Sequence, residues 1–300
     1  MPRSVAAGVD ATFEQNRSSL LGLAYRMLGS LAEAEDVVQE AWLRWQAAAL
    51  TEIVSPRAFL RKVVTRLCLD QLKSARMRRE EYVGPWLPEP LAAGAHDAEP
   101  VLDRDVTMGL MLALERLTPA QRAAFLLHDV FDVPFGEIAS ILGQSTEACR
   151  QNAARARRLI RQSGKRFEPD YAEADRLTDA FLRAARDGDA GALERLLADN
   201  IVIHADGGGI RPAARNLIAG QDRAIRFLLG VRRKWGDHLS RIVHRGRINA
   251  APGFVTVEPD GLPQVTVIEA AGGRITALYV IRNPAKLRRL PAFPFDRVPP

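Results

Sequence analysis

The segment from Ala148 to Arg166 carries a run of positive charge without a single acidic residue. Arginine and lysine neutralise phosphate groups, and arginine, asparagine and glutamine also present hydrogen-bond donors to base edges. A solvated surface helix would normally mix both signs of charge. Nucleic acid is therefore the predicted partner, and a plain solvated basic helix is the alternative. The basic residues of this segment are Arg150, Arg155, Arg157, Arg158, Arg161, Lys165 and Arg166.

The residues before this segment have the layout of a helix-turn-helix. Ile138, Ala139 and Leu142 follow the spacing of a short amphipathic helix, which Gly143 ends because glycine readily adopts a positive φ. Ser145 can cap the next helix, and the small Ala139 lets the two helices cross closely. An α-helix in this setting fits the major groove of DNA. The outward positions predicted for the second helix are Glu147, Arg150, Gln151, Asn152, Arg155 and Arg158.

Polar residues in the second half of the chain could form the acid and base pair of an enzyme. The candidates are His204, Asp206, Trp235, His238 and His244. The simpler interpretation of the sequence DGGG at 206–209 is a turn whose glycines allow another backbone to approach closely. Catalysis is the less favoured interpretation, and no spacing of histidine and acidic residues indicates a metal site. Cys68 and Cys149 fall in helical patterns and predict neither a disulfide framework nor a cysteine-rich zinc site.

Helical patterns in the first part of the chain position two further groups of polar side chains. After an amphipathic helix at 13–28, the segment 31–45 has one apolar and one polar face. The polar face is formed by Asp36, Gln39, Glu40 and Leu43. The next helix starts at Ser55-Pro56, because proline is favoured in the first helical turn. Its apolar stripe lies opposite a basic stripe of Lys62, Arg66, Lys73 and Arg76.

A proline-rich stretch interrupts the helical part of the chain. Residues 84–100 contain four prolines and two glycines, which excludes a helix interior and predicts a linker. Helical patterning resumes at Val101 and, after a cap at Thr118, continues to the basic helix. The predicted organisation is a domain at 1–83, a linker at 84–100, a second domain at 101–166 and a third at 167–300.

The last part of the chain changes to mixed patterning. Gly272 and Gly273 are predicted to join the last two strands as a hairpin. Helices followed by a meander of antiparallel strands predict an α+β domain whose sheet curls around a pocket. The predicted helices are 172–186, 190–197 and 221–235, and the predicted strands are 201–205, 241–248, 253–258, 264–270 and 274–282.

Composition narrows the class of protein. With 300 residues, of which 47% are hydrophobic and 26% charged, the chain is long enough for two or three domains with packed cores. The formal net charge of +6 fits an acidic polymer as partner. No segment approaches the roughly 20 apolar residues that a membrane-spanning helix needs, and the first residues lack the apolar core of a signal peptide. The prediction is a cytoplasmic protein without membrane association.

Three motifs resemble a known family. AEDVVQEAWLRW at 34–45, PRAFLRKVVTRLCLDQLKSARMRR at 56–79 and the segment 117–161 are similar to regions two and four of the sigma-70 family. More narrowly, they resemble the extracytoplasmic-function group, which retains only these two regions. The second half of the chain resembles the SnoaL-like cone fold. WLPEP at 86–90, DGGG at 206–209 and NPAKL at 283–287 are similar to signatures of the subgroup in which a SnoaL-like domain is fused to the sigma factor.

This resemblance implies two all-α domains, the second with a helix-turn-helix, and a C-terminal α+β SnoaL-like cone fold. It also implies roles for residues that match the family motifs. The residues implied to face core RNA polymerase are Asp36, Gln39, Glu40 and Trp42. Those implied to lie along the minus-ten promoter element are Lys62, Arg66, Asp70, Lys73 and Arg76. Those implied to contact the minus-thirty-five element are Arg150, Gln151, Asn152, Arg155 and Arg158. Trp42 suits the internal core nearly as well, and Asp70 suits a cap or an intramolecular ion pair.

The SnoaL-like signatures imply regulatory contacts between the third domain and the linker. Members of the subgroup usually have a basic residue after DGGG and an aspartate third in NPxKL. Ile210 and Ala285 occupy these two positions, so the usual polar contacts are not expected from their side chains. The residues implied to make the regulatory contacts are Trp86, Leu87, Pro88, Asp206, Gly207, Gly208, Gly209, Asn283, Pro284, Lys286 and Leu287.

The resulting prediction is a non-enzymatic initiation factor that docks on core RNA polymerase, reads two elements of promoter DNA and is regulated in cis by its third domain. No cofactor and no metal are expected, and an unidentified small-molecule ligand in the C-terminal pocket is left open. One alternative is a ligand-responsive helix-turn-helix regulator that binds duplex DNA without polymerase. The acidic helix and the basic helix argue against it, because such a regulator needs no domain that binds single-stranded DNA. The other alternative is a SnoaL-type enzyme with a DNA-binding module.

Overall fold

The chain folds into two compact units. The computed structural model describes residues 3–48, 53–80, 82–92, 106–162, 171–236 and 240–290, with the backbone alone for 3–10, 74–80 and 171. The helical unit contains the described residues of 3–80 and 110–162. The C-terminal unit contains residues 82–92 and 106–109 and those from 171 onward. Residues 84–92 of the predicted linker are therefore part of the C-terminal unit.

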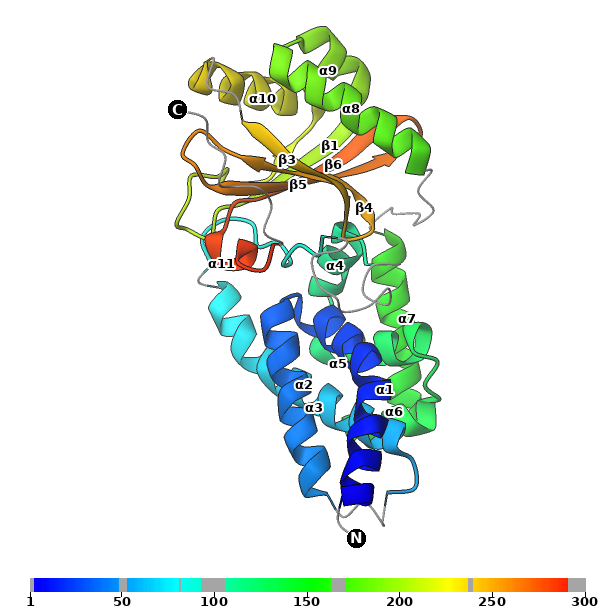
Figure 1. Ribbon diagram of the computed structural model, residues 1–300. Helices are drawn as coiled ribbons and strands as arrows, with labels where there is room; N and C mark the ends of the chain where they lie inside the picture. Colours follow the sequence, from blue (N-terminus) through cyan, green and yellow to red (C-terminus); the bar gives the residue numbers. More distant parts are fainter. Residues whose placement is uncertain are drawn as a thin grey trace. The chain divides into compact units, whose positions relative to one another are not determined.

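The helical unit follows the predicted order of helices (Figure 1). Its elements are α1 (Arg3–Leu28), α2 (Leu31–Ala47), α3 (Pro56–Glu80), most of α4 (Met108–Glu115), α5 (Pro119–Phe125), the π-helical turn η2 (Leu126–Val130), α6 (Phe135–Leu142) and α7 (Thr146–Gln162). The cap at Thr118 is confirmed, because its hydroxyl accepts from the Gln121 N–H and the Gln121 side chain accepts from the Thr118 N–H. The helix predicted from Val101 begins only at Met108, and residues 101–105 lie outside the described part of the chain.

The predicted helix-turn-helix is present in α6 and α7. Gly143 ends α6 in the left-handed region, with φ of 64°, and the Gln144 N–H bonds the Ala139 carbonyl at 3.1 Å. The Ser145 hydroxyl accepts from the Ala148 N–H at 3.1 Å, as predicted for the cap of the second helix. The buried face of α7 consists of Cys149, Ala153, Ala156 and Ile160, so its basic residues point outward.

A buried arginine ties α1 and α4 to α5. Arg122 is 2% exposed, and its guanidinium donates to the Leu114 carbonyl at 2.6 and 2.9 Å and to the Met27 carbonyl at 2.6 Å. An ion pair of 2.9 Å with Glu115 completes the site. Burial lowers the pKa of Arg122 to about 10, so the group is still charged at neutral pH. Removing the guanidinium would leave the carbonyls of Leu114 and Met27 and the carboxylate of Glu115 without their charged partner.

The C-terminal unit is an α+β fold built on one six-stranded sheet (Figure 1). The strands lie in the order β2-β1-β6-β5-β4-β3, and the sheet is not closed. The elements are α8 (Tyr171–Asp187), α9 (Ala190–Leu196), β1 (Leu197–Asp206), β2 (Ile218–Ala219), α10 (Gln221–Trp235), β3 (Arg241–Ile248), β4 (Ala251–Val257), β5 (Pro263–Ala271), β6 (Arg274–Ile281) and α11 (Pro284–Leu287). The predicted fold class is thus confirmed.

One pairing in the sheet differs from the predicted antiparallel meander. Strands β3 to β6 pair antiparallel in chain order, but β1 pairs with β6 in parallel, with Ile203 opposite Leu278 and Asp206 opposite Ile281. The expectation of an all-antiparallel sheet was therefore wrong at this pair. The parallel pairing places the end of β1 beside the end of β6, so the DGGG and NPAKL sequences leave the sheet at the same edge.

Each face of the sheet is covered by a different part of the chain. Helices α8, α9 and α10 cover one face, where Phe181, Leu193, Ile203, Phe254 and Leu278 belong to a continuous apolar cluster (Figure 1). α11 and residues 82–92 lie on the opposite side of the sheet. Among the described residues, no helix combines the length and apolar character that a bilayer-spanning segment needs.

Replacing Arg122 by methionine tests the role of this buried guanidinium. We expect Arg122→Met to lower the free energy of unfolding by about 3–5 kcal/mol, because one partner of a buried charged network is removed. The control is Arg157→Met, which breaks a partly exposed ion pair with Asp129 and should cost about 0–1 kcal/mol. Urea unfolding followed by helical circular dichroism measures both. Equal midpoints for the two variants would contradict the assignment.

Candidate functional site

Asp206, at the end of β1, accepts hydrogen bonds from three separate segments of the chain. Its carboxylate is fully buried. Oδ1 accepts from the Tyr82 hydroxyl at 2.5 Å and from the Gly208 N–H at 2.9 Å. Oδ2 accepts from the Leu87 N–H at 2.9 Å and from Nζ of Lys286 at 2.6 Å. Each oxygen thus holds two donors, which uses the acceptor capacity of a carboxylate in full.

Lys286 supplies the positive charge of this site. Its ammonium group donates to the Leu87 carbonyl at 2.5 Å as well as to Asp206. The same nitrogen lies 4.3 Å from the ring centre of Trp86 and 5.0 Å from that of Tyr82, within the range of cation–π attraction. The lysine of NPAKL therefore binds a carboxylate, a carbonyl and two aromatic rings, three of these groups coming from residues 82–87.

Asn283 joins the same network from the start of α11. Its side-chain oxygen caps the Ala285 N–H at 3.0 Å, and its Nδ2 donates to the Tyr82 hydroxyl at 2.8 Å. The contribution of Ala285 is its backbone N–H, so an alanine at this position leaves the cap intact. Burial, together with the hydrogen bond to the negative Asp206, raises the pKa of Tyr82 and keeps its hydroxyl a donor.

The glycines after Asp206 leave room for these contacts. Gly208 has φ of 66°, and a Cβ atom there would lie 2.5 Å from Cγ of Asn283. A side chain on Gly207 would collide with the Arg211 carbonyl, and one on Gly209 would lie 3.3 Å from Cβ of Val83. DGGG therefore forms a turn that another part of the chain approaches closely, as the sequence predicted.

The linker is held to the C-terminal unit over its whole described length. Residues 87–92, which include Leu87 and Pro88, are all buried. Leu91 and Asn249 exchange two hydrogen bonds, from the Leu91 N–H to Oδ1 at 2.8 Å and from the Asn249 N–H to the Leu91 carbonyl at 2.9 Å. Beyond the linker, at the start of α4, the Gly109 N–H donates to Glu269 of β5 at 2.7 Å. Both ends of the segment that joins α3 to α4 are thus anchored on one sheet.

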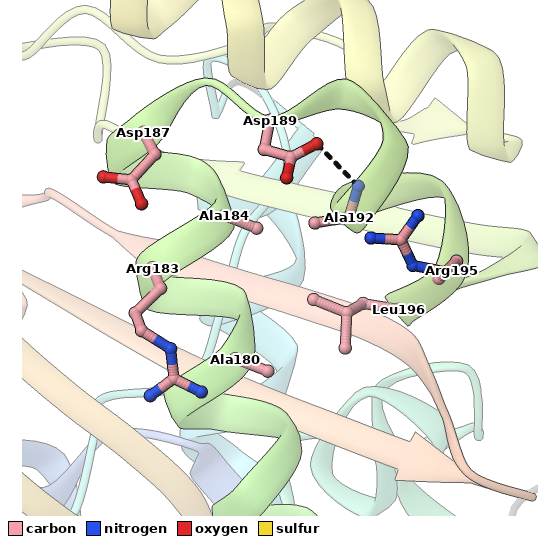
Figure 2. Close-up of a pocket in the computed structure, with 8 residues that line it drawn as sticks. All are labelled: Ala180, Arg183, Ala184, Asp187, Asp189, Ala192, Arg195 and Leu196. Atoms are coloured by element: carbon pink, nitrogen blue, oxygen red, sulfur yellow. Dashed lines mark hydrogen bonds between the residues drawn. The ribbon is translucent and has the colours of Figure 1, made fainter.

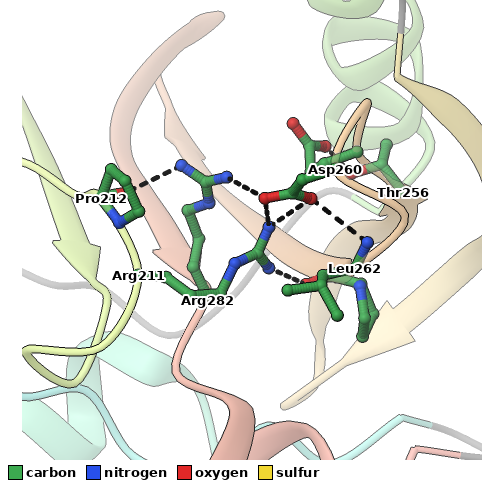
Figure 3. Close-up of polar contacts among 8 residues, drawn as sticks. Arg211, Pro212, Thr256, Asp260, Leu262 and Arg282 are labelled. Atoms are coloured by element: carbon green, nitrogen blue, oxygen red, sulfur yellow. Dashed lines mark hydrogen bonds and ion pairs between the residues drawn. The ribbon is translucent and has the colours of Figure 1, made fainter.

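A buried arginine that the sequence reasoning missed fixes the end of the DGGG turn (Figure 3). Ile210 is 72% exposed, whereas Arg211 is buried and donates to Asp260 at 2.6 and 2.7 Å and to the Pro263 carbonyl at 2.7 Å. Burial opposes the charge on Asp260, but the hydrogen bonds from Arg211 and from the Leu262 N–H outweigh it and lower its pKa. The sequence did hold a signal for this arginine, because Arg211 stands one residue after the position at which the fused subgroup usually has a basic residue.

His204 and Asp206 lie two residues apart on one face of β1, but the other described acid and base candidates lie elsewhere in the fold. His204 of β1 lies with its ring centre 5.1 Å from that of Tyr279, while His244 belongs to β3, which three strands separate from β1. Trp235 ends α10, and His238 lies outside the described residues. The fifth candidate, Asp206, is occupied by four donors. The described residues also contain no group of three or more His, Cys, Asp or Glu side chains placed to hold a metal ion.

A shallow hollow of about 380 Å³ lies between α8 and α9 (Figure 2). Arg183 and Arg195 border it together with Asp187 and Asp189, and Asp189 is used as a cap for the Ala192 N–H at 2.9 Å. None of the acid and base candidates lines it. The face of the sheet under the helices is filled by the apolar cluster, so a ligand in the C-terminal unit stays a prediction.

Three of the four residues expected to face polymerase lie on the polar side of α2. Asp36 and Gln39 are exposed, and Glu40 is half-buried and bonds Arg44 at 2.8 Å. Trp42 is half-buried, with its ring centre 4.8 Å from that of the buried Phe13. The apolar side chain that does lie open on the polar face is Leu43, at 53% exposure.

The basic stripe of α3 is already partly engaged. Arg66 donates to the carbonyls of Ile141 and Ser140, at the end of α6, at 3.2 and 3.3 Å. Asp70 forms an ion pair of 2.8 Å with Lys73, and both are largely exposed. Lys62 is half-buried, and the side chain of Arg76 lies outside the described part of the structure.

The outward face of α7 presents most of the residues predicted to meet DNA. Arg150, Gln151, Arg155 and Arg158 are exposed, and Nδ2 of Asn152 bonds Oε1 of Gln144 in the turn at 3.0 Å. Glu147 lies close to both Arg150 and Gln151, at 3.6 and 3.4 Å. The helix therefore offers cations and amides to a groove, with Asn152 held in place from the turn.

Comparisons with known proteins agree with this architecture. The sequence profile described as Sigma-70 region 2 matches residues 12–78, and that described as Sigma-70, region 4 matches residues 107–160. The ECF RNA polymerase sigma factor SigJ of Mycobacterium tuberculosis is 39% identical over 292 residues, which cover 93% of each chain. The probable ECF RNA polymerase sigma factor SigI of the same species is 33% identical over 95% of this chain and 96% of its own.

A solved structure extends the likeness to the fold of nearly the whole chain. The crystal structure of the extracytoplasmic function sigma factor SigJ of Mycobacterium tuberculosis matches with a TM-score of 0.77 and 36% sequence identity. The match covers 94% of this chain and 99% of that chain, so it includes both the helical and the α+β parts. The chain therefore belongs to the extracytoplasmic-function sigma factors of the sigma-70 family.

Proposed function

We propose that this protein is an initiation factor that binds core RNA polymerase and promoter DNA and that its C-terminal unit regulates this activity in cis. The observation that carries the regulatory part is the network around Asp206, which holds the linker with Tyr82, Leu87 and Lys286. The function itself is tested by retention on core polymerase followed by run-off transcription from a cognate promoter. Transcription without retention, or retention without transcription, would contradict it.

Regulation in cis follows from where the linker is anchored. The chain between α3 and α4 is held at residues 82–92 by Asp206, Lys286 and Asn249 and near Gly109 by Glu269. Anchors at both ends restrict how far the two DNA-binding helices, α3 and α7, can separate. A switch of this kind requires two states that differ by only a few kcal/mol, so the loss of one contact shifts the populations measurably.

We propose that the C-terminal unit is not catalytic. Asp206 has no free lone pair with which to act as a base, because four donors occupy its two oxygens. His204 and His244 belong to strands that are not neighbours, and the apolar cluster fills the face of the sheet where a substrate would need space. A fold that is shared with enzymes does not transfer their chemistry.

The polar face of α2 is proposed as the contact with core polymerase. Asp36, Gln39 and Glu40 precede the exposed Leu43 by seven, four and three residues, so acidic and amide groups adjoin one apolar side chain on the same helical face. Interfaces commonly combine apolar contacts with charges that select a partner of opposite sign. Leu43 replaces Trp42 as the proposed apolar anchor, since the tryptophan ring packs on Phe13.

Charge reversal tests this face. We expect Asp36→Arg combined with Glu40→Arg to weaken retention by core polymerase at least about tenfold, because like charges then face each other. The control is Asp187→Arg combined with Glu194→Arg, which makes the same charge change at exposed positions of α8 and α9. Pull-down with purified core polymerase measures both. Unchanged retention of the first variant would remove this face from the interface.

Base readout and phosphate contact are assigned to different parts of α7. We expect Asn152→Ala to cost about 1–3 kcal/mol at a single promoter position and to relax the preference there. Arg161→Ala, near the end of the helix, should weaken all sequences alike and reduce the slope of log K against log salt by about 0.9. Binding of the holoenzyme to a promoter library at several salt concentrations measures both effects. Indistinguishable profiles would show that this division is wrong.

A matched pair of glycine substitutions tests the regulatory network. Gly208→Ala places a Cβ atom against Asn283 and should release the linker and raise promoter output. Gly272→Ala carries a similar backbone strain, since φ is 58° there, but its Cβ meets nothing within 4 Å, so output should stay at the wild-type level. Reporter transcription at equal protein abundance is the measurement.

Deletions extend the same test. Removal of residues from Asn283 onward should also raise promoter output. Deletion of everything after Arg166 should give an output that differs from that of the shorter deletion, because the whole sheet that anchors the linker is then lost. Identical output from the full-length, Gly208→Ala and deleted proteins would leave the C-terminal unit without a role in initiation.

A further inference from the structure

Helix α10 of the C-terminal unit carries a row of cations that the regulatory contacts do not use. At about 100° per residue, four basic residues fall within roughly 100° of the helix circumference, and all four are exposed. The acidic residue of α10, Asp222, lies about 20° outside this arc. The face is defined by Arg223, Arg226, Arg233 and Lys234.

The opposite side of α10 fixes the direction in which these cations point. Ala224 is fully buried under the helix. At one end, Nε2 of Gln221 donates to the carbonyls of Glu194 and Leu197 at 2.8 and 2.7 Å. At the other end, Nε of Arg232 donates to the Arg186 carbonyl at 2.7 Å. The helix is thus secured at both ends, and its basic face is turned to solvent.

The charges of α10 differ from those of its neighbour α8. On α8, Asp175 and Asp179 form ion pairs of 2.8 and 2.6 Å with Arg247 and Arg245 of β3. Among the ion pairs of the described residues, none joins a carboxylate to a cation of the α10 face. Arg223 and Arg226 near one end of the face, and Arg233 and Lys234 at the other, form two pairs of neighbouring like charges, an arrangement that favours a polyanionic partner.

The dimensions of this face suit a nucleic acid backbone. From Arg223 to Lys234 the helix rises about 16 Å, a length over which one strand of duplex DNA carries about five phosphates. Gly230 lies in the middle of the arc, and a Cβ there would meet nothing within 4 Å, so a backbone can approach the helix closely. A lipid surface fits less well, because the apolar side of α10 already packs against the sheet. Val231 is the one large apolar side chain of this helix that is markedly exposed, so little apolar surface is left to enter a bilayer.

We propose that α10 is a third DNA-binding surface, which contacts phosphates of promoter DNA outside the two elements read by α3 and α7 and carries no base preference. This inference rests on the proposed function, because it takes promoter DNA as the polyanion. It assigns to the C-terminal unit a direct part in holding DNA, in addition to holding the linker.

The test removes three charges from the face and compares the result with the same loss elsewhere. The variant is Arg223→Gln with Arg226→Gln and Arg233→Gln. The matched control is Arg176→Gln with Arg183→Gln and Arg195→Gln, three exposed arginines of α8 and α9 in the same unit. Holoenzyme formed with each full-length chain is bound to one cognate promoter duplex and to the same duplex with both elements scrambled, between 50 and 200 mM salt.

Loss of three phosphate contacts should reduce the salt slope by about 2.7, so the wild type should lose about 40-fold more affinity than the variant across this range. The affinity of the variant should fall by the same factor on both duplexes, since no base contact is removed. Hydroxyl-radical footprinting should show loss of protection at backbone positions outside the two elements. Arg226→Lys, which keeps the charge, should retain the wild-type slope.

Three outcomes would overturn the proposal. They are a variant with the wild-type slope and footprint, a control with an equal loss, and a variant that loses binding only to vesicles of anionic lipid. The third would assign the face to membranes. Failure of the proposed function would look different, because the wild-type chain itself would then form no promoter complex with core polymerase, whereas failure of this inference leaves specific wild-type binding intact.

Discussion

The buried carboxylate of Asp206 is the constraint on which the arrangement of the C-terminal unit depends. An ionised carboxylate without partners is costly to bury, so four donors must be delivered to it at the same time. Those donors come from the linker, from the turn after β1 and from the helix after β6, segments that lie far apart in the sequence. The parallel pairing of β1 with β6 brings two of these segments to one edge, and the linker completes the set.

Buried cations play a corresponding role in both units. Arg122 binds carbonyls at the ends of α1 and α4, and Arg211 binds the carboxylate of Asp260 in the turn after β4 and the carbonyl of Pro263 at the start of β5. In both places the planar guanidinium satisfies groups from different elements at once, which lysine could not do with the same geometry. The protein thus uses its excess of arginine in two ways, as internal connectors and as exposed cations on α7 and α10.

Local patterns predicted the elements well, because each depends on residues close in sequence. The bounds of α10 and β3 match their predictions, and the turn at Gly143 and the caps at Thr118 and Ser145 formed as their residue types indicated. The parallel β1–β6 pair could not be predicted in this way, because a period-two pattern gives the faces of a strand and not its neighbours.

Contacts between side chains that are distant in the sequence could be predicted only in part. The glycines and the lysine of the signatures indicated which residues would meet, but Arg211 was not predicted, because its partners Asp260 and Pro263 lie 49 and 52 residues further along the chain. Leu43 was predicted on the polar face of α2, but its exposure of 53% was not anticipated. The engagement of Arg66 was beyond prediction, since its partners are backbone carbonyls, which every residue possesses.

That contact of Arg66 has a consequence for the order of binding events. The last carbonyls of a helix carry partial negative charge, so the end of α6 offers the guanidinium of α3 much of what a phosphate oxygen would offer. The helix end acts as an internal substitute for nucleic acid. The same N–H groups cannot donate to both, so a phosphate bound by Arg66, as proposed for α3, would have to displace the protein's own backbone. The ion pair of 3.7 Å between Arg61 and Glu137 would still join α3 to α6.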